Sequence, residues 1–97
     1  MTRPRKLDDT EIHERLKALP TWTFVQGKLH RELRFADFQE AFGFMARMAL
    51  VSESLNHHPD WSNVWNRVVI DLNTHDAGGV TDLDLEWAKR ANQAFGG

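Results

Sequence analysis

The sequence predicts an α+β domain of two layers: a four-stranded antiparallel sheet with helices packed on one face, in the order αββαββα. Three segments with apolar residues at helical spacing alternate with two pairs of short segments rich in β-branched and aromatic residues. Capping residues, glycine or proline separate these segments. Because the chain has 97 residues and no linker or repeat, we expect one domain over residues 1–97.

Composition argues against several classes of protein. The formal net charge is -2, with acids and bases mixed along the chain, which argues against nucleic acid as a partner. Cysteine is absent, so disulfides and thiolate chemistry are excluded. The charged N-terminus lacks the apolar region of a secretory signal, and no apolar run approaches the length of a membrane span. We therefore expect a soluble, cytoplasmic protein with no membrane partner.

The first third of the chain predicts a helix and a hairpin. Asp8 and Glu11 have the spacing of a capping box at the start of the helix, and Pro20 stops it. Residues 22–25 and 29–35 are then expected to pair around a turn at Gln26-Gly27. One face of the second strand would comprise Leu29, Leu33 and Phe35, with Arg31 as an exception.

A long middle helix is expected from about Phe38 to Leu55, with Asp37 and Glu40 at capping-box spacing. Its apolar stripe would comprise Phe38, Phe42, Met45, Met48, Ala49 and Leu55. Phe44, Leu50 and Val51 widen the apolar surface beyond that stripe. A helix this broadly apolar is usually covered on more than one side, and in so short a chain a second subunit is a plausible cover.

The last third predicts a second hairpin and a final helix. The hairpin would run through Val64 and Trp65, turn near Asn66-Arg67 and return over residues 68–72. Inside a strand, Trp65 is expected to be a core aromatic. The final helix would start at Thr81, whose spacing to Asp84 is that of a capping box.

Three of the five histidines flank this second hairpin. His57 and His58 precede it and His75 follows it, so the three imidazoles can converge in space. Glu53 lies four residues before His57 and would share its helical face if the helix ran that far, where it could orient an imidazole. Asp84 is expected first as a helix-start residue, and a role at the site would be additional.

Two simpler interpretations compete with a catalytic one. A histidine pair at a helix end often only caps carbonyl groups and favours the negative end of the helix dipole. Three histidines with nearby carboxylates also suggest a metal site, but the sequence has no His-x-x-x-His pair, and adjacent imidazoles tend to point in different directions. We therefore expect no metal.

The residues around the histidines resemble the signature of the pterin-4a-carbinolamine dehydratases. This signature comprises Glu53, His57-His58-Pro59, Asp60 and Trp61, then Asn63-Val64-Trp65-Asn66, then Thr74-His75-Asp76, and finally Gly79 and Asp84. Asp37-Phe38 and residues 41–45 of the middle helix resemble the family as well. Trp65 departs from its pattern, because tyrosine is commoner there. The resemblance covers residues 37–84, and the N-terminal third agrees in architecture alone.

The resemblance implies a hydro-lyase without metal or organic cofactor. Its substrate would be the 4a-hydroxytetrahydropterin released by aromatic amino acid hydroxylases, and its product the quinonoid dihydropterin that a reductase recycles to tetrahydrobiopterin-type cofactor. The resemblance also implies a homodimer or homotetramer with the middle helices at an interface. A second role as a protein-binding dimerisation partner is a further expectation.

The resemblance and the reaction together suggest roles for the site residues. His57 and His75 would be the acid and the base, because imidazole can both give and take protons near neutral pH. His58 would position the substrate and assist, while Glu53 and Asp84 orient or tune the imidazoles. Candidates for substrate binding beside the three histidines are Asn56, Trp61, Asn73, Thr74 and Asp76, with Trp61 as an apolar wall.

Overall fold

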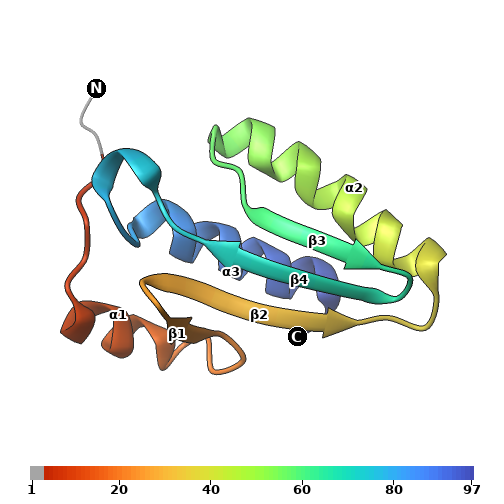
Figure 1. Cartoon of the computed structure of the whole chain (residues 1–97), viewed down its shortest axis with the longest axis horizontal. Helices are drawn as coiled ribbons and strands as arrows, with labels where there is room; N and C mark the ends of the chain where they lie inside the picture. Colours follow the sequence, from red (N-terminus) through yellow and green to blue (C-terminus); the bar gives the residue numbers. More distant parts are fainter. Residues whose placement is uncertain (1–3) are drawn as a thin grey trace.

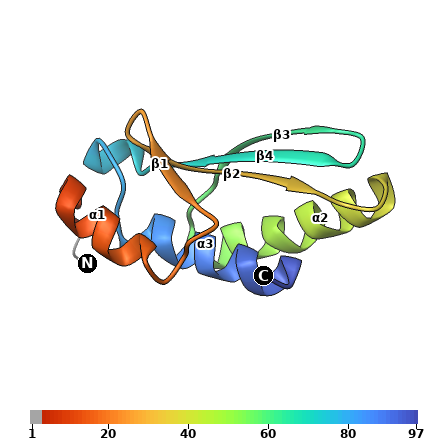
Figure 2. The same ribbon diagram turned by 90° about the horizontal axis from the view of Figure 1, so that it is seen from below.

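The computed structural model describes residues 4–97 and confirms the α+β prediction. The helices and strands are α1 (Asp9–Leu16), β1 (Thr23–Val25), β2 (Lys28–Arg34), α2 (Phe38–Leu55), β3 (Asp60–Val64), β4 (Arg67–Leu72), the short 3₁₀ helix η1 (His75–Ala77) and α3 (Asp82–Phe95). The antiparallel sheet has the order β1-β2-β4-β3 (Figure 1). Figure 2 shows α1, α2 and α3 together on one side of this sheet, as predicted. No helix within residues 4–97 is long and apolar enough to cross a membrane.

The first hairpin has the predicted turn. Gln26 and Gly27 both adopt positive φ, 51° and 79°, and Val25 pairs with Lys28. Positive φ at both central residues is the geometry that suits the twist of a two-residue hairpin. Leu29 and Leu33 are buried on β2, so this strand presents its apolar face to the helices as expected.

The second hairpin turns one residue earlier than predicted. Val64 pairs with Arg67, so the turn is Trp65-Asn66. The Asn63 side chain donates to the carbonyl groups of Trp65 (3.0 Å) and Arg67 (2.9 Å), which holds the turn in this register. Trp65 is therefore at a hairpin tip with φ 50°, and 63% of it is exposed. The expectation that Trp65 is a core aromatic was wrong.

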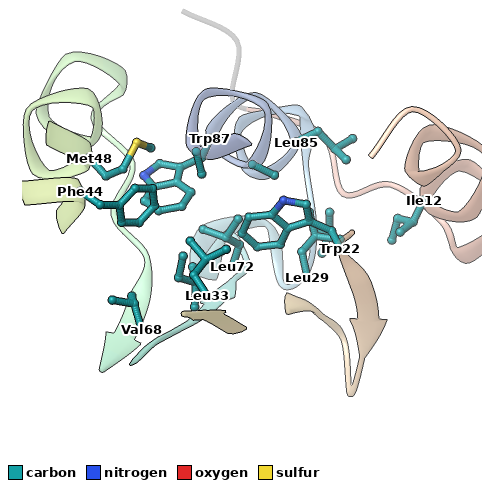
Figure 3. Close-up of a cluster of buried hydrophobic side chains, with 14 of the residues drawn as sticks. Ile12, Trp22, Leu29, Leu33, Phe44, Met48, Val68, Leu72, Leu85 and Trp87 are labelled. Atoms are coloured by element: carbon teal, nitrogen blue, oxygen red, sulfur yellow. The ribbon is translucent and has the colours of Figure 1, made fainter. Parts of the chain in front are cut away.

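The core lies between the sheet and the helices, with Trp87 of α3 at its centre. Figure 3 shows its indole between Phe44 and Met48 of α2 and the leucines of the sheet. Trp22 and Trp61 meet Trp87 edge to face, with ring centroids 6.5 Å and 5.9 Å away. Such edge contacts add to the stabilisation from burial itself. The remaining fully buried residues come from all layers, so a single core holds the helices on the sheet.

Helix α2 divides its apolar residues between two faces. The buried face comprises Ala41, Phe44, Met48 and Ser52, with Met45, Val51 and Leu55 partly buried beside it. Phe38, Phe42 and Ala49 of the predicted stripe are exposed instead. The difference has a simple cause. Phe44, Met48 and Ser52 are four residues apart and face the sheet. Phe38 and Phe42 lie roughly a quarter to a third of a turn around the helix from that face.

A buried polar contact joins the end of α2 to α3. The Trp87 indole N–H donates to Ser52 Oγ at 2.9 Å, and that hydroxyl donates to the carbonyl of Met48 at 2.7 Å. Trp87 is fully buried and Ser52 is 1% exposed. Because buried polar groups are costly without partners, this bond favours one arrangement of the two helices.

The N-terminal segment is held against the rest of the chain. The backbone N–H of Leu7 donates to the carbonyl of Val80 at 2.9 Å. Arg5 donates twice to the Glu11 carboxylate, at 2.9 Å and 2.8 Å, and Asp8 completes the predicted capping box with Glu11. The hydrogen bonds from Arg5 and from the Asp8 backbone lower the pKa of Glu11 to about 2. These contacts fix the course of the chain before α1.

Replacing Trp65 should stabilise the protein. A left-handed backbone costs most L-residues about 1–2 kcal/mol, whereas asparagine tolerates it. We therefore expect Trp65→Asn to raise the free energy of unfolding by about 1 kcal/mol in urea denaturation. Val64→Asn is the matched control, since Val64 is 62% exposed but lies in extended β3. An equal gain from both substitutions would contradict the explanation by backbone conformation.

Candidate active site

The end of α2 directs the two adjacent histidines. The helix ends at Leu55, and Asn56 adopts the left-handed conformation with φ 50°. Asparagine is among the few residues that visit this region readily. The backbone N–H of His57 still donates to the carbonyl of Ser52 at 3.0 Å, so His57 is fastened to the last turn of the helix. The left-handed residue turns the chain there, so the helix ends at Leu55 as the sequence predicted.

The segment after β4 forms the opposite side of the site. Thr74 forms a β-bridge with Gly79, and its N–H donates to the Gly79 carbonyl at 2.8 Å. Between them, η1 carries His75 at its first position. Gly78 closes the loop with φ 76°, a conformation that requires glycine in practice. In Figure 1 this turn after β4 lies at the same end of the molecule as the end of α2.

The two segments enclose a cavity of about 400 Å³. Its lining residues are Pro4, Asn56, His57, His58, Asn73, Thr74, His75, Asp76, Ala77 and Leu83. The structure thus brings together the three histidines and the four polar residues that the sequence suggested around them. This volume falls in the usual range for sites that take small molecules.

His57 is bonded to a fully buried carboxylate. Its Nε2 lies 2.5 Å from Asp84 Oδ1, and the His57 side chain is 9% exposed while that of Asp84 is 0% exposed. Asp84 also completes the predicted capping box of α3, because its Oδ2 accepts from the Thr81 N–H at 2.9 Å. When a carboxylate is ionised it only accepts hydrogen bonds, and in that form of Asp84 the donor is His57 Nε2. Its Nδ1 has no hydrogen-bond partner among residues 4–97 and is the nitrogen left for a ligand.

His58 has a carboxylate partner of a different kind. Its Nε2 lies 2.7 Å from Glu53 Oε1, and the two side chains are 56% and 78% exposed. Glu53 therefore meets His58 and not His57, the residue whose helical face it was expected to share. The reason is that α2 ends at Leu55, so the i, i+4 relation does not extend to His57.

His75 completes the set of imidazoles. It is exposed, lines the cavity from η1, and its ring makes no hydrogen bond with residues 4–97. Both of its ring nitrogens are therefore without a hydrogen-bond partner in the described part of the chain. Within the described part of the chain, no group of three or more His, Cys, Asp or Glu side chains is arranged to hold a metal ion.

The apolar lining of the cavity differs from the one expected. Trp61 does not line the cavity; it lies on β3 and packs against Trp87. Pro4 and Leu83 line the cavity, and so does Ala77, although none of the three was singled out in the sequence. Only the position of Ala77, between His75 and Gly78, could have suggested it. The apolar wall of the cavity thus comes from the N-terminal segment and α3.

The two histidine–carboxylate pairs should contribute unequally to stability. Asp84→Asn places an N–H₂ group among buried donors, and unsatisfied buried groups cost about 1–3 kcal/mol each. We expect this variant to lose about 2 kcal/mol or more in urea denaturation. Glu53→Gln is the matched change in an exposed pair, where ion pairs contribute about 0–1 kcal/mol. Similar losses for the two variants would contradict the difference in burial.

Comparisons with known proteins show the family to which this chain belongs. A family model described as pterin 4 alpha carbinolamine dehydratase matches residues 5–94. Relatives from Solibacter usitatus (52% identical, covering 95% of this chain and 97% of the relative) and Burkholderia cenocepacia (55%, covering 87% and 84%) carry the provisional name pterin-4-alpha-carbinolamine dehydratase. A crystal structure described as a transcriptional coactivator/pterin dehydratase from Brucella melitensis has a TM-score of 0.90 at 44% identity, covering 94% of this chain and 99% of that one. The resemblance seen in the sequence is confirmed: this chain belongs to the pterin 4 alpha carbinolamine dehydratase family, a family of hydro-lyases.

Proposed function

We propose that the protein dehydrates 4a-hydroxytetrahydropterin to the quinonoid dihydropterin by histidine acid–base catalysis. The observation that carries this proposal is the convergence of His57, His58 and His75 on one cavity of about 400 Å³. Membership of a family named for this reaction supports the choice of substrate. The polar lining residues Asn56, Asn73 and Asp76 offer donors and acceptors to the edge of a flat heterocycle.

The reaction requires one proton donor and one proton acceptor. The bond between the ring carbon and its hydroxyl breaks, the hydroxyl takes a proton from an acid and leaves as water, and a neighbouring ring nitrogen gives its proton to a base. No electrons are gained or lost by the protein. Imidazole suits both tasks, because its ordinary pKa of about 6.5 is close to neutral pH.

His57 and His75 are the acid–base pair in this proposal. His57 Nε2 is bonded to Asp84, which supports Nδ1 as the nitrogen that would act on the substrate. His75 lines the same cavity from η1. His58, paired with Glu53 at the rim, positions the substrate and assists. The chemistry needs no metal and no organic cofactor, and elemental analysis of the purified protein distinguishes it from a metal-binding function.

Removing either acid–base histidine should slow turnover more than it weakens binding. Proton transfer by a positioned side chain typically contributes a factor of about 10²–10⁴. We expect His57→Ala and His75→Ala to lower kcat by that order while KM changes little. The assay generates the 4a-carbinolamine and follows its loss against the spontaneous rate. His13→Ala is the control, because His13 is exposed on α1. Full rates in both variants would exclude the assignment.

We also propose that the protein forms a homodimer or homotetramer through the second face of α2. Phe38, Phe42 and Leu50 are 46%, 57% and 74% exposed there. A cluster of large apolar side chains on one helix favours burial against a like surface. The same face would serve a protein-binding role, and the Brucella melitensis structure is described as a transcriptional coactivator as well as a dehydratase.

The oligomer should depend on this face. We expect Phe42→Asp to shift the protein to a smaller species in sedimentation velocity, because a buried unpaired charge opposes association. Val25→Asp is the control, since Val25 is 48% exposed on β1, outside α2. A wild-type protein that sediments as a monomer would contradict the proposal directly.

The proposed reaction places the protein between two other enzyme activities. A hydroxylase acting on aromatic amino acids would supply the 4a-carbinolamine, and a reductase would consume the quinonoid product. Both are expected in the cytoplasm. The reaction would thus serve recycling of a tetrahydrobiopterin-type cofactor, and the neighbouring activities are measurable in an extract of the source cells.

A further inference from the structure

A chain of buried hydrogen bonds lies behind His57. Thr74 Oγ1 is 2.9 Å from Asp84 Oδ2 and 2.7 Å from Thr81 Oγ1, and the Leu83 N–H donates to Thr81 Oγ1 at 3.2 Å. Thr74, Thr81 and Asp84 are 7%, 0% and 0% exposed. The capping box of α3 needs only Thr81 and Asp84. Helix capping therefore does not explain why the Thr74 hydroxyl contacts Asp84 and Thr81.

The direction of each bond follows from counting protons. A threonine hydroxyl has one proton to donate. The ionised Asp84 carboxylate has none, so Thr74 must give its only proton to Asp84 Oδ2. Thr74 then can only accept from Thr81, whose hydroxyl in turn accepts from the Leu83 N–H. Every hydrogen bond in this series therefore donates toward the Asp84 carboxylate.

This direction constrains His57. With Oδ2 occupied by Thr74 and by the Thr81 N–H, Asp84 presents Oδ1 to His57 as an acceptor. A neutral imidazole facing that acceptor carries its proton on Nε2 and leaves Nδ1 as a base. Thr74 also directly precedes His75 in the sequence. It contacts Asp84, the partner of His57, and is bonded covalently to the third histidine of the cavity.

We propose that Thr74 is a positioning residue: its hydroxyl gives its single proton to Asp84 and thereby holds His57 in the Nε2–H tautomer. Thr74 was expected to bind substrate, but in this role its hydroxyl points away from the ligand. The part that concerns the tautomer stands on the geometry alone, and the part that concerns turnover rests on the proposed dehydratase function.

The test combines a spectroscopic and a kinetic measurement on three variants. Nitrogen NMR of protein labelled in its histidines reports which ring nitrogen of His57 carries the proton. We expect wild type and Thr74→Ser to show the Nε2–H form. In Thr74→Val the carboxylate loses a buried donor that favours its ionised form, so Asp84 can carry a proton and donate it to His57 Nε2, and a mixture with the Nδ1–H form is expected. In Thr74→Val kcat should fall on the order of tenfold, the rate equivalent of one hydrogen bond to a charged group, with little change in KM.

Thr23→Val is the matched control. Thr23 is exposed on β1 and its hydroxyl makes only a 3.3 Å bond to a backbone carbonyl, so neither measurement should change. Rescue by serine separates the hydroxyl from the methyl group of the side chain. A merely structural role for Thr74 would lower stability without moving the tautomer.

Each outcome decides a separate part of the proposal. An Nδ1–H tautomer in wild type overturns the proposal even if Thr74→Val does not fold. Unchanged tautomer and kcat in a folded Thr74→Val overturn it as well. If the tautomer shifts as expected but wild type shows no dehydration above the spontaneous rate, the positioning role stands and the dehydratase function fails.

Discussion

The buried carboxylate of Asp84 holds three segments of this structure together. It accepts from the first turn of α3, from the strand end that precedes η1, and from the imidazole that follows α2. A carboxylate with no exposed surface is stable only when several donors compensate for the lost water. Those donors come from three segments, so satisfying one charge also assembles the site. The same interaction that begins a helix thus orients the proposed acid–base group.

The elements that support this charge are held by the core. The Trp87–Ser52 bond fastens α3 to the end of α2, and Trp87 packs edge to face on Trp22 and Trp61. A fully buried indole with its N–H satisfied leaves little freedom to the helices that touch it. The end of α2, where the two adjacent histidines follow, is therefore fastened directly to the core.

Much of the site could be predicted because its segments flank one hairpin. Residues at the two ends of a hairpin lie at the same edge of a sheet, so His57 and His75 had to approach each other. The capping box at Thr81 could also be predicted from the sequence, because it depends only on the spacing of Thr81 and Asp84. Glu53 was assigned to the wrong imidazole because one left-handed residue, Asn56, changes the direction of the chain. The contact of the Thr74 hydroxyl with Asp84 could not be predicted, because it depends on how two segments pack and not on the spacing of residues.

The two kinds of wall around the cavity are held by independent contacts. The imidazole side depends on a buried network, whereas Pro4 depends on a segment secured by the exposed Arg5–Glu11 pair and one backbone bond to Val80. Substitutions in that segment would change the shape of the cavity while leaving the hydrogen bonds of His57 and Asp84 in place. In the proposed function, selectivity would therefore depend on the N-terminal segment and reactivity on the buried network.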